Sequence, residues 1–197
     1  MTPRALSIIR DEHRSVAAML RALDTLVQQS QGAGSPRFFD AARAMLYYID
    51  EFPERLHHPK ESDLLFPKLL RRDPTLMPVI ERLEHDHLTG EPRVRGLQHL
   101  LLSWELLGPS RREAFVTELR SYLRFYLDHM RCEESEVLPR AIQLLDAADW
   151  RELDASFSAH SDPGVQHLNG ETAPEFEKLF ARIVSVLPEP AGFGQPL

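Results

Sequence analysis

Two stretches of this sequence repeat one another, HHPKESDLLFP at residues 57–67 and HMRCEESEVLP at residues 129–139. Each holds a histidine, a glutamate four residues later and a final proline. The offset is 72 at all three positions, because 129 − 57, 133 − 61 and 139 − 67 give the same number. A constant offset over separated positions predicts two structural elements of the same kind.

The segments that precede these stretches also match, at an offset of 74. The matched pairs are Leu6 with Ile80, Ile9 with Leu83, His13 with His87, Leu20 with Val94 and Leu23 with Leu97. Apolar residues at steps of three or four mark one face of a helix. We therefore interpret the chain as a duplicated helical hairpin.

Helical periodicity runs through most of the sequence, and no segment alternates with period two for long enough to predict a sheet. The expected fold is all-α, an antiparallel up-down-up-down four-helix bundle. Proline lacks a backbone donor, so Pro53 and Pro59 predict a kink or a break in the second helix. The four helices are expected near residues 4–29, 37–70, 76–107 and 111–145.

The rest of the chain is interpreted as an addition to the bundle. Residues 1–146 form the metal-binding domain, and residues 147–197 form a C-terminal helical extension packed on it. Short helices are expected near 147–159 and 174–187, separated by Asp162-Pro-Gly and Asn169-Gly, before an irregular tail.

The composition of the chain excludes several classes of partner and of metal site. A net charge of −7 and a pI near 5.7 argue against a nucleic-acid partner. No run approaches the ~18 apolar residues of a membrane span, and the first residues lack a signal segment, so we expect a cytoplasmic protein without a membrane partner. The single cysteine, Cys132, excludes a multi-cysteine site, so any metal must use nitrogen and oxygen ligands.

The duplicated residues predict a metal site. Helical residues four apart lie on one face, so each His-x-x-x-Glu directs an imidazole and a carboxylate into one volume. His13 and His87 lie on the apolar faces of the first and third helices. Buried carboxylates without partners cost several kcal/mol, which argues that the site is filled. Each half has too few ligands for a six-coordinate ion, so two ions sharing the carboxylates are expected, of iron, manganese, zinc or cobalt.

These motifs resemble the hemerythrin-like proteins with the histidine–histidine–glutamate cation-binding domain, over residues 4 to about 145. The resemblance is carried by DEHR (residues 11–14), residues 57–67 with LFP at 65–67, Asp86-His87 and residues 129–139. It implies two iron ions bridged by an oxygen atom (oxo or hydroxo) and two carboxylates, although another divalent ion can occupy such a site in vitro. Carried over by position, the ligands are His13, His57, Glu61, His87, His129 and Glu133.

This ligand set departs from the oxygen carriers of that family, which have five histidines, one glutamate and one aspartate. The departure weakens an oxygen-transport function. Members of the family bind or sense dioxygen, respond to nitric oxide or peroxide, or repair iron–sulfur centres.

Three assignments have neighbours that compete with them. His58 adjoins His57, but only His57 keeps the one-turn spacing to Glu61. His85 would keep the 72-residue offset, whereas His87 lies on the apolar face. Glu91, one turn beyond His87, is either an added ligand or acid of the site or an exposed residue.

Further residues near the motifs have two interpretations each. Tyr126 and Tyr122 lie on the face of His129 and either donate hydrogen bonds to the centre or pack in the core. Cys132 is interpreted as a small buried apolar residue rather than a redox thiol. Unmatched histidines are expected at the surface or at helix ends, and the tryptophans in packing: His99, His160, His167, Trp104 and Trp150.

The sequence favours a di-iron protein that binds, senses or scavenges a small oxidant, O2, NO or peroxide. An iron-donating repair protein is less favoured, because such proteins usually carry an N-terminal cysteine pair. A ferritin-like oxidase is disfavoured by the order His-x-x-x-Glu. A structural or storage metal site, or a metal-free interaction bundle, is the remaining alternative. A homodimer or a separate signalling partner is left open.

Overall fold

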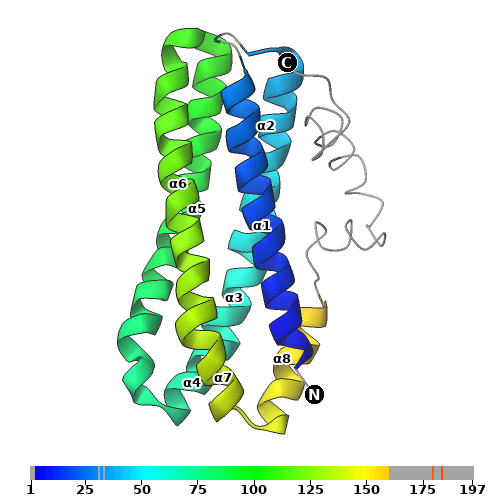
Figure 1. Ribbon diagram of the computed structural model, residues 1–197, viewed down its shortest axis with the longest axis vertical. Helices are drawn as coiled ribbons and strands as arrows, with labels where there is room; N and C mark the ends of the chain where they lie inside the picture. Colours follow the sequence, from blue (N-terminus) through cyan, green and yellow to red (C-terminus); the bar gives the residue numbers. More distant parts are fainter. Residues whose placement is uncertain (1–2, 31, 33, 160–178, 180–182, 184–197) are drawn as a thin grey trace.

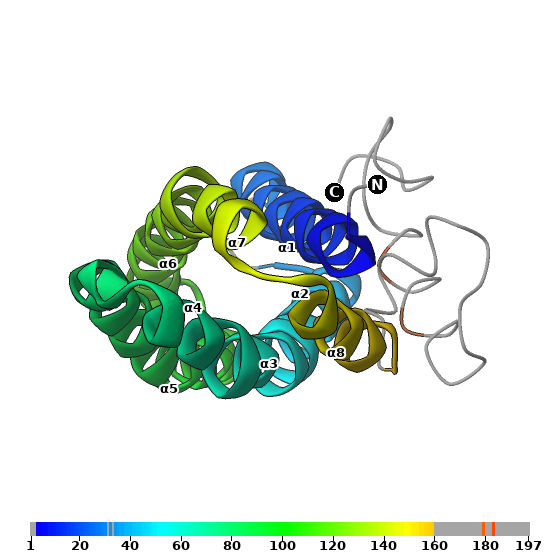
Figure 2. The ribbon, with the colours of Figure 1, turned by 90° about the horizontal axis from the view of Figure 1, so that it is seen from below.

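The computed structural model describes residues 3–30, 32, 34–159, 179 and 183. These residues are almost entirely helical and contain no strand, which confirms the all-α prediction. Four long helical segments run alternately up and down (Figure 1). Viewed along the bundle, α1, α2, α5 and α6 surround the interior in this order (Figure 2).

The first and third segments are single long helices, α1 (Arg4–Gln29) and α5 (Met77–Leu107). The second is α2 (Pro36–Ile49), η1 (Asp50–His57), α3 (His58–Lys60), η2 (Glu61–Leu65) and α4 (Phe66–Arg72). The fourth is α6 (Arg112–Cys132), η5 (Glu133–Val137) and α7 (Leu138–Leu144). The short 3₁₀ turns η3 (Pro74–Leu76) and η4 (Pro109–Arg111) precede α5 and α6.

The second segment continues through its prolines, where the sequence predicted a kink or a break. The segment is not broken there but widens into π-helical turns, and the His58 amide donates to the carbonyl of Pro53, five residues back. A wider turn keeps the path helical while the proline ring avoids the preceding carbonyl. A π-turn also begins at each glutamate of the repeat, η2 at Glu61 and η5 at Glu133.

Two groups of buried apolar side chains fill the interior. The large core occupies the end of the bundle around Leu20, Phe38, Trp104 and Phe115. The small core occupies the other end and is represented by Leu6, Phe66, Leu83 and Leu138. The buried histidines and glutamates lie between the two cores, so the fold itself isolates them from water.

The segment after the bundle begins with α8 (Ala147–Ala159), as the sequence predicted. It packs against α1, and its Leu153 and Phe157 side chains join the small core. The helix expected at 174–187 lies outside the described residues except for Leu179 and Ile183, which pack on the large core. None of the helices in the described part of the chain is long and apolar enough to cross a bilayer.

Candidate metal centre

The six predicted ligand side chains converge between the two cores, and each comes from the helical segment that the sequence assigned to it. Glu61 and Glu133 are 0% and 1% exposed, and the His87 side chain is 7% exposed. His13 comes from α1, and His87 comes from α5. The side chains that converge are His13, His57, Glu61, His87, His129 and Glu133.

They form two overlapping groups of four, each with its ligand atoms within 4.8 Å of one another. One group adds His13 and His57 to the two glutamates, and the other adds His87 and His129 to the same glutamates. Both carboxylates therefore belong to both groups. Imidazole nitrogens and carboxylate oxygens gathered in this way are donors that suit a first-row divalent cation.

The atoms that face the interior of these groups have no hydrogen-bond partner in the described part of the chain. They are the Nε2 atoms of all four histidines and both carboxylate oxygens of Glu61 and Glu133. The nitrogens lie 3.2–3.7 Å from carboxylate oxygens without the alignment of a hydrogen bond. Leaving buried polar atoms unpaired costs about 1–3 kcal/mol each, so eight of them together fit a bound cation and not an apolar core.

The other ring nitrogen of two of these histidines is held by an acid on the neighbouring helix. His57 Nδ1 lies 2.6 Å from Glu12 Oε2, and His129 Nδ1 lies 3.4 Å from Asp86 Oδ2. A partner on Nδ1 fixes the ring and directs Nε2 toward a metal. Sequence reasoning missed both acids, although Glu12 and Asp86 obey the 74-residue offset.

The remaining pair of histidines is held from the opposite half of the duplication. His13 Nδ1 lies 3.0 Å from Glu134 Oε1, on the residue that follows Glu133. His87 Nδ1 lies 3.0 Å from the Ser62 hydroxyl, on the residue that follows Glu61, and Ser62 donates to Glu84 at 2.9 Å. Each half thus orients one imidazole of the other, and the 72-residue offset between residues 62 and 134 was the available signal.

The carboxylates also set the charge of the cluster. Burial lowers the pKa of His129, but Glu133 and Asp86 outweigh it and bring the pKa to about 10. Against the same effect of burial, Glu61 and Glu12 hold the pKa of His57 well above its usual value. Burial raises the pKa of Glu133, but the imidazoles around it hold that pKa well below the usual range. In the metal-free cluster, His57 and His129 therefore favour the imidazolium form beside the carboxylates, and a cation would displace their protons.

A family model named Hemerythrin HHE cation binding domain matches residues 4–141. The chain belongs to the hemerythrin family. The match spans the four helical segments and all six converging side chains, and a cation-binding function agrees with the buried histidine and glutamate groups. The comparison with curated proteins gives no match.

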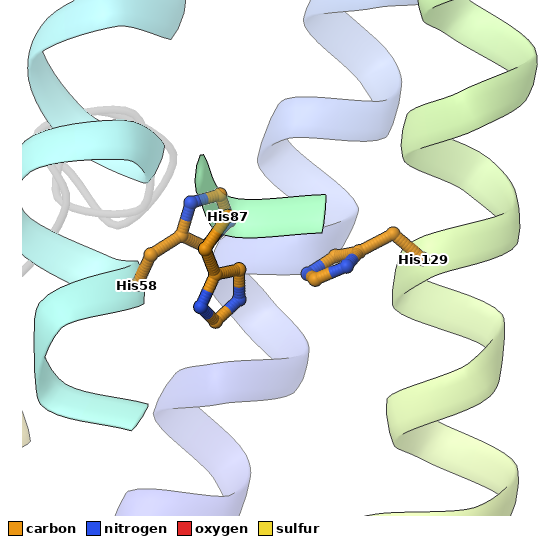
Figure 3. A group of neighbouring side chains, drawn as sticks. All are labelled: His58, His87 and His129. Atoms are coloured by element: carbon orange, nitrogen blue, oxygen red, sulfur yellow. The ribbon is translucent and has the colours of Figure 1, made fainter. Parts of the chain in front are cut away.

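Within this hemerythrin domain, His58 lies beside the centre with both ring nitrogens occupied. Nδ1 contacts Glu54 Oε2 at 3.1 Å, and Nε2 contacts the Tyr126 hydroxyl at 3.0 Å. Its ring stacks on His87 with 4.1 Å between centroids, and His129 faces both rings (Figure 3). Burial and the neighbouring imidazoles hold the pKa of His58 well below its usual value, so the ring is neutral.

The two tyrosines extend this contact into a buried polar chain, which we call the His58 chain: Tyr126, His58, Glu54 and Tyr122. The Tyr122 hydroxyl donates to Glu54 Oε1 at 2.8 Å. The hydroxyls thus contact Glu54 and His58, not the six converging side chains. Burial raises the pKa of Glu54 to about 7 despite the Tyr122 hydrogen bond. Gly90 leaves room for Glu54, because a Cβ there would lie 2.6 Å from Glu54 Oε1.

The other residues singled out in the sequence lie away from the centre. Glu91 is 43% exposed at its side chain and pairs with Arg95, and His85 and His99 are exposed. Cys132 packs in the small core, and burial raises the pKa of its thiol. Trp104 is fully buried in the large core. His160 and His167 lie outside the described residues.

Proposed function

We propose that two iron ions occupy this centre and that the protein binds a small oxidant, O2, NO or peroxide, as a sensor or scavenger. The observation that supports this most directly is the set of eight unpaired ligand atoms in two groups that share Glu61 and Glu133. His13 and His57 would hold one ion, His87 and His129 the other, and both glutamates would serve both.

Iron is favoured by the chemistry of the ligands. Imidazole and carboxylate in mixed sets suit iron, and also manganese, zinc and cobalt, whereas thiolate-dependent sites are excluded because Cys132 lies in the small core. Iron supplies one-electron redox chemistry and free coordination positions for a small molecule. The protein supplies fixed imidazoles, buried carboxylates and exclusion of water.

Few ligands per ion favour a small exogenous ligand. Two nitrogens and two shared carboxylates provide fewer donors than the six positions of an octahedral ion. The walls around the centre are buried side chains of the two cores, which leave no room for a bulky substrate. The alternatives of iron donation and of a storage or structural metal site lack a comparable observation.

Metal analysis followed by optical spectroscopy tests the proposal. Protein purified from iron-supplemented cells should contain about two iron ions per chain, as the two overlapping groups require. The anaerobically reduced protein should change its visible spectrum on exposure to O2, NO or hydrogen peroxide. Iron-loaded protein that is silent toward all three would establish a storage or structural site, and protein that binds no metal would overturn the proposal altogether.

A further inference from the structure

A mostly enclosed cavity of about 10 Å³ adjoins the centre on the side of the large core. Its wall includes the imidazoles of His13, His57 and His129, whereas neither Glu61 nor Glu133 is among the described residues that line it. Both glutamates lie one turn farther along their helices, toward the small core. A cavity of this volume holds about one water-sized molecule. The cavity thus adjoins three of the ligand imidazoles on the side away from Glu61 and Glu133, and the carboxylate at its wall is that of Glu12, which holds His57 Nδ1.

The surface outside this cavity is hollowed by a groove of about 510 Å³ between α1 and the end of α6. His13 and Met130 line both the groove and the cavity. These two side chains are therefore the wall between the solvent and the space beside the centre.

Only one of the two can move without breaking a polar contact. His13 is fixed by Glu134 at Nδ1, and its Nε2 faces the cation site. Met130 is 6% exposed and is unbranched, with three rotatable side-chain bonds. A rotamer change at Met130 would connect groove and cavity while the centre stays in place.

We propose that Met130 is the gate through which a small ligand reaches the centre, and that its side chain sets the size of ligand admitted. This inference rests on the proposed function. The groove is lined by three arginines, Arg14, Arg21 and Arg131, and by one carboxylate, Glu134. Arg14 pairs with Asp11, and Arg131 pairs with Asp128. With these pairs counted, the groove has little excess of either charge, so we expect Met130 to select neutral diatomics and small anions alike by their size.

Stopped-flow mixing of the iron-loaded full chain with azide and with NO tests the gate. Met130→Ala should bind azide about tenfold faster and Met130→Phe about tenfold slower, because gating acts on the association rate. Met130→Leu, which nearly conserves volume, should resemble the wild type. Leu123→Ala is the matched control, a truncation on the same helix that lines neither space, and should leave the rate unchanged.

A second probe measures size selection. Cumene hydroperoxide should oxidise the reduced centre of Met130→Ala but not that of the wild type, while hydrogen peroxide should oxidise both. Iron content is measured for every variant, and Met130→Leu and Met130→Phe keep the test decisive if the alanine variant loses metal. Equal azide rates in iron-replete wild type, Met130→Leu and Met130→Phe would overturn the gate alone. Iron-replete wild type that binds neither azide nor NO nor peroxide would overturn the proposed function as well.

Discussion

The two halves of the duplication, residues 4–72 and 77–144, hold the same ligands but surround them differently. His57 and His129 occupy equivalent places, yet Glu12 lies 2.6 Å from the first and Asp86 lies 3.4 Å from the second. Likewise, the partner of His13 is the Glu134 carboxylate, whereas the partner of His87 is the Ser62 hydroxyl. The ligand set is symmetric, and its supports are not.

The two halves differ more strongly at the positions one helical turn closer to the large core. At the 72-residue offset, Glu54 corresponds to Tyr126, because 54 + 72 = 126, and His58 corresponds to Met130. One half therefore places the acid and the imidazole of the His58 chain beside the centre, and the other places a thioether at the groove. Divergence at these positions places a buried acid and imidazole on one side of the centre and a thioether on the other.

The largest losses of bound iron are expected at the histidines that occupy equivalent places in the two halves. His57→Ala and His129→Ala should each lower bound iron from about two ions per chain to about one or less, because each removes a ligand and leaves buried carboxylates unbalanced. Metal analysis and the visible spectrum measure the loss. His99→Ala, at an exposed position of α5, is the control and should keep both ions. Full iron content in either ligand variant would show that its half is not part of the site.

The contacts of Glu12 and Asp86 with the ligand histidines differ in length, so removing them should cause smaller and unequal losses of metal affinity. Glu12→Gln should weaken metal binding within the range of about 10- to 100-fold that is typical of outer partners of ligating histidines. Asp86→Asn should weaken it less, because its contact with His129 is longer. Competition with a chelator measures both affinities. Equal losses would show that the difference between the two contact distances does not affect metal affinity.

Acidity should affect the metal-free and the loaded protein in opposite directions. The pKa of His129 is raised to about 10 in the fold, above its unfolded value near 6.5. The stabilisation by its imidazolium is therefore fully present below about pH 6.5 and is lost as the pH rises through about 10. Metal requires the neutral ring, so metal affinity should rise over the same window, by about tenfold per pH unit for each proton released.

Thermal unfolding of the metal-free protein and metal uptake in buffers of different ionisation enthalpy measure the two trends. The metal-free protein should lose stability from pH 7 to 10, and uptake should release protons. Uptake without proton release would mean that the imidazoles are already neutral in the metal-free fold.

The sequence predicted much of this arrangement because duplication is visible in the chain itself. Repeated spacing identified the helices and brought His57 and Glu61 to the interior. The same spacing favours His57 over His58, and this assignment stays a prediction. In the structure the Nε2 of His57 is unpaired and both nitrogens of His58 have partners, although His58 also forms a possible cation-binding group with His87 and His129. Such inferences depend only on which face of a helix a residue occupies.

Contacts between helices were harder to predict. Glu12, Glu134 and Ser62 read as ordinary polar helix residues until the rotation of each helix about its axis is known, because the partner lies on another helix. The π-turns were missed for a related reason. Proline predicts the loss of a hydrogen bond, but whether the helix breaks or widens depends on the packing of the side chains after it.

The last predicted effect concerns the folding of Gly90 variants; Gly90 corresponds to Val16 in the first half at the 74-residue offset. Alanine normally stabilises a helix interior relative to glycine by about 1 kcal/mol, and Gly96→Ala on the same helix, with open space at its Cβ, should show that gain. Gly90→Ala should instead destabilise by about 1–3 kcal/mol, because the new methyl group would displace a buried carboxylate from its partners. Denaturant unfolding of both metal-free variants measures the difference in sign. The mechanism requires Glu54 to hold its place against Tyr122 and His58, so the Gly90 penalty should shrink in a Glu54→Ala background. A stabilised Gly90→Ala protein would show that the carboxylate shifts freely, and that the His58 chain does not hold the polar side of the centre in a fixed geometry.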